Sequence, residues 1–392
     1  PFMGNRPVAA LAPAFAPPRL VAHVVNRLDA GGAGNGLLEL IAHMPGERYR
    51  HAVLCLRDHS LIHTHLREYG VEVIDLHKRD GADPGHFVRM VRALRALQPD
   101  LVHTRNFGGL EGQLAAALAG VRLRVHGEYG RDPAEACRTR PPGLLRRVLG
   151  PLVGHYIAVS AEQERWLIEQ LGAEPSRVSQ ISNGVDSLEF HPRLGPHAAV
   201  GPAGFMHDDA FVIGSVGRMD EARSHTTLVE AFLRLISSPH ASHSRLRLLI
   251  VGDGPMRAEC QAMLDRAGAG YLAWLPGERL DTAQLMRAMD LMVLPALAEG
   301  SGNVLLEAMA TGLPVVATSV GVHKELVQPG LTGILVPPNS PDVMATAIAD
   351  YCRIPEMGAR HGARARGQVI AHHSLPAMAR SYLAVYDALA GR

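Results

Sequence analysis

The chain has 392 residues, of which 47% are hydrophobic and 20% are charged, and this composition excludes a disordered, collagen-like or supercharged protein. Its 39 Lys plus Arg against 38 Asp plus Glu leave a net charge of +1, so no global field draws it to nucleic acid and we expect no nucleic-acid partner. At roughly 150 residues per domain, the length predicts two domains, each with its own core.

The start of the chain and its cysteines indicate a compartment. Residues 1–18 are rich in Ala and Pro and are interpreted as a loose leader, because prolines make a poor apolar region for a secretory signal. The four cysteines are far apart and include no CxxC pair, which favours a reducing compartment over a disulfide framework. No apolar run reaches the roughly 18 residues that span a bilayer. We therefore expect a cytoplasmic protein.

Short apolar runs alternate with amphipathic stretches in residues 19–190, the first predicted domain. The runs predicted as strands are residues 20–25, 51–56, 71–76, 101–104, 121–126 and 156–160. Between them, apolar residues from Phe87 to Leu97 recur at helical spacing, which predicts a helix that ends before Pro99. Strands that are buried on both faces and separated by helices form a parallel, doubly wound sheet.

A second series of the same kind follows residues 191–209, a stretch rich in Pro, His and Gly that is predicted to be a linker. The second predicted domain, residues 210–374, has strands at 211–216, 246–251, 291–294 and 314–317. Residues 375–392 are predicted to form a helix that can cross back to the first domain. The predicted fold class is therefore α/β, with two Rossmann-like domains that face each other across a cleft, where ligands of such sheets bind.

The segment at residues 298–317 carries the strongest chemical signal. It places Glu299 in a glycine-rich loop after a predicted strand and Glu307 eight positions later, in the following helix. Gly300 and Gly302 allow the backbone to approach a ligand, and the free N–H groups at the helix start favour an anion such as a phosphate. Glu307 is placed to accept hydrogen bonds from vicinal hydroxyls such as those of a ribose, and Glu299 to reach a further polyol.

A second loop, residues 215–223, follows another predicted strand and carries Arg218 and Arg223. Departure of a nucleoside diphosphate builds negative charge on its phosphates. Two fixed cations stabilise that charge most strongly in the transition state.

The 298–317 segment resembles the signature of retaining glycosyltransferases of family 4, two glutamates separated by seven residues, in enzymes with the two-domain GT-B fold. Residues 25–32, 100–106, 125–128, 181–186 and 275–278 are similar to one branch, the sugar transferases associated with exosortase and exopolysaccharide gene clusters. The resemblance implies that Glu307 holds the nucleotide ribose and Glu299 the donor sugar. It also implies that His126 supports the donor near the reacting carbon.

The chain departs from this pattern at three places. Gly34 stands where the branch normally carries Glu, which bears on acceptor positioning. Arg223 stands where family members usually have Lys, and it replaces a compact ammonium with a planar fork. Residues 322–324 differ from the usual loop, although Gly321 and Glu325 persist.

The predicted site residues come from both domains. The expected catalytic residues are Arg218, Arg223, Glu299 and His126, and the expected donor-binding residues are Gly31, Gly32, Gly217, Gly277, Gly300, Ser301, Gly302, Asn303, Val304 and Glu307. We expect no metal site and no cofactor, because no HExxH motif, acidic pair or Cys/His cluster is present and a nucleotide sugar is a substrate. Residues 251–255 are interpreted as a tight strand-to-helix turn rather than a phosphate loop.

The predicted function is transfer of a sugar, with retained configuration, from a nucleoside-diphosphate sugar to an acceptor hydroxyl in exopolysaccharide or other glycoconjugate synthesis. The expected acceptor is a glycan or a lipid-linked molecule. Residues 138–149 interleave basic and leucine side chains, which suits either peripheral contact with the inner membrane face or an ordinary amphipathic surface helix. Two alternatives remain open, a catalytically impaired nucleotide-binding paralogue or scaffold and a nucleotide-sugar epimerase.

Overall fold

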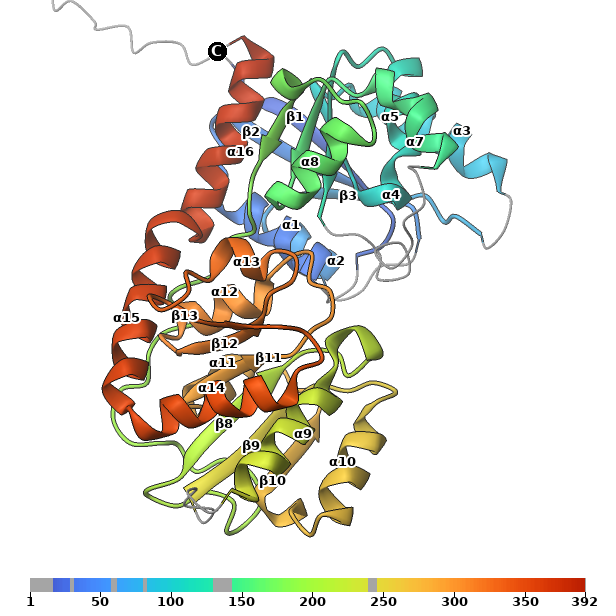
Figure 1. Cartoon of the computed structure of the whole chain (residues 1–392). Coiled ribbons are helices and arrows are strands. Elements are labelled where there is room, and N and C mark those ends of the chain that lie inside the picture. The colour runs from blue at the N-terminus through green and yellow to red at the C-terminus, as the bar shows by residue number, and fades with distance from the viewer. Residues whose placement is uncertain are drawn as a thin grey trace, which may run out of the picture.

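The computed structural model describes residues 17–28, 32–57, 62–79, 83–129, 143–238 and 245–391, with the side chains of 32–35 and 62–64 left aside. Two α/β units, here called the N-domain and the C-domain, lie one above the other (Figure 1). The expected fold class is confirmed, because each unit is built on one parallel sheet with helices between its strands.

The N-domain sheet has seven strands in the order β3-β2-β1-β4-β5-β6-β7, and every neighbouring pair is parallel. The strands are β1 (Arg19–Val25), β2 (Tyr49–Cys55), β3 (Glu72–Asp75), β4 (Leu101–Arg105), β5 (Leu123–Glu128), β6 (His155–Ala158) and β7 (Val178–Gln180). All six predicted strands are present. The short β7 was not predicted, because three residues are too few to show a period.

The C-domain sheet has six parallel strands in the order β10-β9-β8-β11-β12-β13. The strands are β8 (Phe211–Val216), β9 (Leu246–Val251), β10 (Ala273–Gly277), β11 (Leu291–Leu294), β12 (Val315–Thr318) and β13 (Gly333–Val336). The four predicted strands are confirmed. The edge strands β10 and β13 were not predicted, although each contains a short apolar run, Ala273–Leu275 in β10 and Ile334–Val336 in β13.

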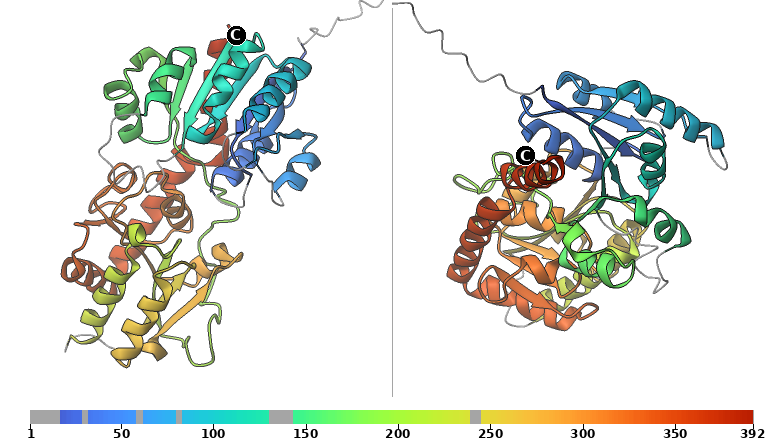
Figure 2. Two further views of the ribbon diagram at one scale, coloured as in Figure 1. Left: turned by 90° about the vertical axis from the view of Figure 1, so that its right-hand side faces the viewer. Right: turned by 90° about the horizontal axis from the view of Figure 1, so that it is seen from above.

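Helices cover both faces of each sheet (Figures 1 and 2). Those of the N-domain are α1 (Gly32–His43), α2 (Ile62–Glu68), α3 (Pro84–Leu97), α4 (Asn106–Gly109), α5 (Glu111–Leu118), α7 (Leu144–Leu149) and α8 (Ala161–Glu169). Those of the C-domain are α9 (His225–Ile236), α10 (Arg257–Arg266), α11 (Thr282–Arg287), α12 (Asn303–Ala310), α13 (His323–Leu326), α14 (Pro341–Arg353) and α15 (Pro355–His372). The helix predicted before Pro99 is α3, which Asp83 caps by accepting a hydrogen bond from the amide of His86 at 3.3 Å.

The last helix, α16 (Leu375–Ala390), returns to the N-domain and lies along it (Figure 2). Its apolar side Leu375, Met378, Tyr382 and Tyr386 joins the core formed by one face of the N-domain sheet. Asp387 also pairs with Arg48 at 2.7 Å. The described part of the chain therefore starts with β1 in the N-domain, crosses to the C-domain and returns to the N-domain with α16.

The carboxyl ends of the strands in the two sheets face each other. Glu325 in α13, which follows β12, accepts hydrogen bonds from the amides of Ala161 at 3.0 Å and Glu162 at 3.2 Å, at the start of α8 after β6. The side-chain amide of Asn183 donates to the side-chain oxygen of Asn303, the first residue of α12, at 2.6 Å. This arrangement is the one in which α/β sheets bind ligands, beyond the carboxyl ends of their strands.

Candidate functional site

The loop between β11 and α12 shapes the candidate site. Gly302 precedes α12 in a left-handed conformation with φ 69°, and a Cβ there would lie 2.9 Å from Val322 and 3.0 Å from Leu326. Only glycine meets both demands without displacing its neighbours. The amides that follow open α12 toward the space between the domains, as an anion-binding helix start requires.

Glu299 and Arg223 meet directly in this loop. One carboxylate oxygen of Glu299 pairs with the Arg223 guanidinium, and the other accepts from the amides of Ser301 at 3.2 Å and Gly302 at 3.3 Å. The Glu299 side chain is only 6% exposed, against 34% for Arg223. The structure thus joins two of the predicted catalytic residues, and in this state the Gly302 amide expected to face the diphosphate is held by Glu299.

The loop that carries Arg223 is short and tightly held. Residues Glu221–Arg223 form a 3-10 turn that Asp220 caps by accepting from the Arg223 amide at 3.0 Å. The amide of Leu297 donates to the carbonyl of Ala222 at 2.7 Å, so this loop is tied to the one containing Glu299. Burial lowers the pKa of Arg223 from its ordinary value, and the Asp220 carboxylate opposes that shift.

Arg218 stands free of the Glu299 pair. Its side chain is 76% exposed, and its nearest carboxylate is Asp220 at 3.7 Å. Its backbone is nevertheless fixed, because the amide of Gly217 donates to Val251 at 2.9 Å and that of Met219 to Asp253 at 2.8 Å. The 251–255 turn therefore supports the Arg218 loop, in agreement with its interpretation as a structural turn.

Close backbone packing explains the glycines in these two loops. A Cβ at Gly252 would overlap the carbonyl of Gly217, and the Gly252 amide donates to Gly277 at 2.9 Å. Gly277 ends β10 with φ 84°, and Gly217 follows β8 with φ 143°. The two predicted glycines, Gly217 and Gly277, thus lie on either side of one turn.

Glu307 is the fifth residue of α12, about one turn after the start of the helix, and is half-buried. Burial, and then the charge of Glu189, raises its pKa to about 7. The pKa of Glu39, in α1 of the N-domain, is raised in the same way. Burial is the largest cause, the charges of Glu307 and Asp186 add to it, and together they raise this pKa to about 7. Carboxylates from both domains therefore share one electrostatic environment.

His126 is buried inside the N-domain. Its Nδ1 lies 2.7 Å from the Thr104 hydroxyl and its Nε2 lies 3.3 Å from Glu128, which also accepts from Arg146 at 3.1 Å. Within the described ranges, neither His126, Arg218 nor Glu307 makes a hydrogen bond or ion pair with the Arg223 and Glu299 side chains.

The other predicted residues fall into three groups. Ser301, Asn303 and Val304 line the start of α12 beside Gly300 and Gly302, as the motif implied. Gly32 is the first residue of α1, at the carboxyl edge of the N-domain sheet. Gly31 and residues 138–142 lie outside the described residues.

Two buried histidines near Arg223 were not predicted. His225 is 2% exposed and His323 is 1% exposed. Burial is the main cause that lowers the pKa of each to about 4, and the Arg223 charge adds to it. Both are therefore neutral at pH 7. The only sequence signal was that each closely follows a predicted site loop.

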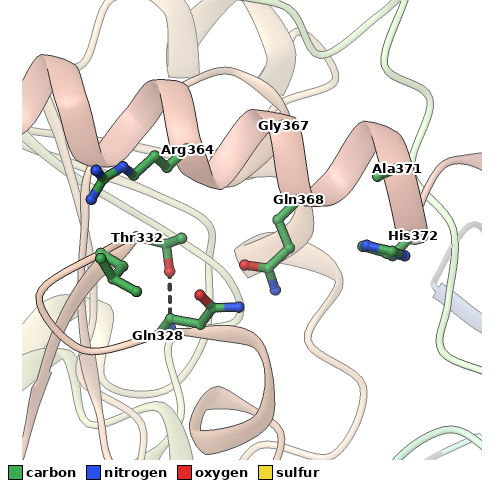
Figure 3. A pocket seen from close by; sticks show the side chains of 8 residues that line it. Gln328, Thr332, Arg364, Gly367, Gln368, Ala371 and His372 are labelled. Carbon is green, nitrogen blue, oxygen red and sulfur yellow. Dashed lines mark hydrogen bonds between the residues drawn. The ribbon is translucent and has the colours of Figure 1, made fainter.

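A separate pocket lies between α15 and the residues that precede β13 (Figure 3). Gln328, Thr332, Arg364 and Gln368 line it, and none of the predicted site residues does so. Elsewhere in the described ranges, no three His, Cys, Asp or Glu side chains are grouped so as to hold a metal ion. No helix there combines the length and apolarity needed to cross a bilayer.

Comparison with known proteins places both domains in one group. Residues 30–187 match the family described as Glycosyltransferase Family 4, and residues 210–353 match Glycosyl transferases group 1. The D-inositol 3-phosphate glycosyltransferase of Geodermatophilus obscurus is 30% identical over 243 residues, which are 60% of this chain and 53% of the relative. The Escherichia coli UDP-Gal:alpha-D-GlcNAc-diphosphoundecaprenol alpha-1,3-galactosyltransferase is 27% identical over 68% of this chain and 70% of its own.

Solved structures share the fold over nearly the whole chain. A glycosyltransferase from Rickettsia africae superposes with a TM-score of 0.80 at 18% identity, covering 95% of this chain and 98% of its own. HepE of Anabaena, solved with UDP and glucose, gives 0.77 at 20% identity, covering 94% and 100%. The chain spans about half the length of the first curated relative. The chain therefore has the two-domain GT-B fold, and each of its two domains matches a glycosyltransferase family model.

Proposed function

We propose that this protein transfers a sugar from a nucleoside-diphosphate sugar to an acceptor hydroxyl, with retention of anomeric configuration. The observation that carries the proposal is the Arg223 and Glu299 pair, fixed at the glycine-rich start of α12. A guanidinium and free helix amides suit a diphosphate, and an adjacent carboxylate suits sugar hydroxyls. HepE, with its UDP and glucose, and the galactosyltransferase relative support a nucleotide-sugar donor.

Donor binding would exchange the internal pair for ligand contacts. Glu299 would release the Ser301 and Gly302 amides and accept from the sugar, while Arg223 would turn to the phosphates. Arg218, exposed and on a fixed backbone, would add a second cation as the leaving diphosphate gains charge. The leaving oxygen would take the acceptor proton on the same face of the sugar. Glu307 would hold the ribose. His126 of β5 would support the donor from the carboxyl edge of the N-domain sheet.

Cations of the chain, rather than a metal ion, would supply the positive charge in this mechanism, so transfer should proceed in EDTA. The proposed acceptor is a glycan or lipid-linked molecule of exopolysaccharide or related glycoconjugate synthesis. Helix α7 exposes Leu144, Leu145 and Val148, which suits contact with a membrane surface. Arg146 is buried against Glu128, so only Arg147 of this helix adds an exposed positive charge.

The donor is tested by melting the protein with UDP, GDP and ADP and with their sugars. A ligand that binds only the folded state raises the melting midpoint, by about 2.7 kcal/mol of stability at a hundred times its dissociation constant. We expect one nucleotide and its sugar to stand out. If none of them raises the midpoint, the proposal fails. Nucleotide binding without transfer to any acceptor would identify the impaired paralogue, and donor conversion without acceptor would identify the epimerase.

Arg218→Ala tests the proposed mechanism. Because the side chain is 76% exposed, the melting midpoint should stay near that of the wild type. Turnover should fall about a hundredfold or more, since a preorganised charge at the transition state is lost. Initial rates at saturating donor measure this, with exposed Arg122→Ala as the control. Near-normal turnover in Arg218→Ala would remove this residue from the mechanism.

A further inference from the structure

One face of the N-domain sheet changes from apolar to polar toward its carboxyl edge. Val21, Tyr49 and Leu101 pack in the core under α16. Two residues further along the same strands stand His23, His51 and His103, and His23 is the register partner of His103. Because side chains alternate along a strand, Arg105 at the end of β4 follows His103 on the same face.

Arg105 is buried without a counter-charge. It is 6% exposed, and its Nε and Nη2 atoms are buried and make no hydrogen bond. Its guanidinium lies over the Tyr129 ring, 4.5 Å from the ring centroid. No carboxylate in the described part of the chain pairs with it. Buried charges in proteins are normally paired, so these unused donors are suited to an anionic partner.

The neighbouring histidines cannot supply that partner. The Nε2 of His23 lies 3.0 Å from the Nδ1 of His51, while His23 Nδ1 and His51 Nε2 are buried and unpaired. Whichever ring donates in this pair, one buried N–H is left without an acceptor and one buried ring nitrogen is left without a donor. Burial lowers the pKa of His51 to about 4, with the Arg105 charge adding to the shift. These neutral rings therefore provide no negative charge to balance the Arg105 guanidinium.

The residues around Arg105 fix the position of its guanidinium. Gly127 on β5 is the register partner of Arg105, and a Cβ on Gly127 would overlap the Tyr129 ring. The Tyr129 hydroxyl is held by His103 at 3.0 Å and by Tyr382 of α16 at 2.9 Å. The ring that supports Arg105 is thus fixed by two hydrogen bonds, and Arg105 lies at the edge of the sheet that faces the C-domain.

We infer that Arg105 binds an anionic group, a phosphate or a carboxylate, carried by the acceptor. This inference rests on the proposed function. The donor diphosphate is assigned to Arg223 and the α12 amides in the C-domain, whereas Arg105 belongs to the N-domain sheet. The planar fork of an arginine matches either oxyanion with two parallel hydrogen bonds. The acceptor is therefore a negatively charged molecule, such as a phosphorylated or uronic-acid-bearing one.

The test measures anion binding in the presence of saturating nucleoside diphosphate, which occupies the donor site. Inorganic phosphate in one arm and glucuronate in the other are titrated at constant ionic strength while the melting midpoint is followed. The proteins are the wild type, Arg105→Gln, Arg105→Lys and the control Arg122→Gln, which removes an exposed charge at the other end of β5. Nucleotide affinity is measured for each variant as an independent readout.

We expect phosphate or glucuronate to stabilise the wild type and Arg122→Gln, and the active arm to name the anion. Arg105→Gln should bind that anion about tenfold more weakly, with nucleotide affinity unchanged. The affinity of Arg105→Lys for the anion should lie between those of the wild type and Arg105→Gln. If Arg105→Gln does not fold, Arg105→Lys is compared with the wild type instead. Equal anion binding by all four proteins would overturn the inference, as would a loss of nucleotide affinity, which would place Arg105 in the donor site. Absence of nucleotide binding by the wild type would instead refute the proposed function.

Discussion

At the scale of single residues, the two half-buried carboxylates Glu39 and Glu307 connect the domains electrostatically. Burial and the nearby charges of Glu307 and Asp186 raise the pKa of Glu39 from 4.5 to about 7. A raised pKa means that the folded state holds the proton more tightly than the unfolded chain does. The contribution to stability is therefore complete below about pH 4.5 and is lost as the pH rises toward about 7.

Glu39→Gln should remove this pH dependence. At about pH 8 the variant should be more stable than the wild type by up to about 3 kcal/mol, and at about pH 4.5 the difference should vanish. Urea unfolding of both proteins at the two pH values measures it. Glu47→Gln, which changes an exposed side chain nearby, is the control for the charge change alone. A gain in stability that is the same at both pH values would contradict the assignment.

At the scale of elements, backbone contacts join the loops of the site to one another. The amide of Val322 donates to the Glu299 carbonyl at 3.1 Å, and Gly321 lies so close that a Cβ would overlap the same oxygen. The persistence of Gly321 in an otherwise altered loop therefore has a packing reason. The altered residues 322–324 include the buried residues Val322 and His323, and Val322 lies beside Gly302 in the loop that carries Glu299.

Gly321→Ala should displace the Glu299 loop. We expect a loss of about 1 kcal/mol from the φ of 43° and a further loss of about 1–3 kcal/mol from overpacking, together with weaker nucleotide binding. Gly330→Ala is the matched control, because Gly330 also has a positive φ, 72°, but has open space around its Cβ position. Thermal melts with and without nucleotide compare them. Equal behaviour of the two variants would show that the contact with Glu299 does not matter.

At the scale of the whole molecule, the Glu325 side chain of the C-domain makes hydrogen bonds to the N-domain. Glu325 accepts from two backbone amides at the start of α8 and from the Gln180 amide at 3.3 Å. A carboxylate at a helix start is favoured by the helix dipole. Since GT-B enzymes act in the space between their domains, this contact bears on how closely the halves approach.

Glu325→Ala should loosen the domain arrangement. In the wild type, the hydrogen bonds of Glu325 favour the domain arrangement of this structure by about 1 kcal/mol. Without them the domains should separate more often, and the radius of gyration from X-ray scattering should increase. Lys324→Ala changes an adjacent exposed residue and is the control. An unchanged radius in Glu325→Ala would assign domain closure to α16 and the other contacts instead.

Much of the fold could be predicted because it depends on local patterns. Strands such as β8, β9 and β11 are mainly apolar, and α3 has helical spacing, a capping Asp83 and a closing Pro99. The three-residue strand β7 is too short to show a pattern. The strands β10 and β13 were found only in the structure, although each contains a short apolar run. The family and the Glu299 loop followed from motifs, whose residues are contiguous.

By itself, then, the sequence determined the α/β class, the presence of two domains and the residues of the glycine-rich loops, since these depend on short-range periodicity and on residue chemistry. Only the tertiary structure decided which charges meet. Arg223 pairs with Glu299, Arg146 with Glu128 and Glu325 with α8, while Arg105 is left buried and unpaired. These outcomes depend on crossovers that bring distant strand ends to one edge, and no local pattern encodes which side chains are then neighbours.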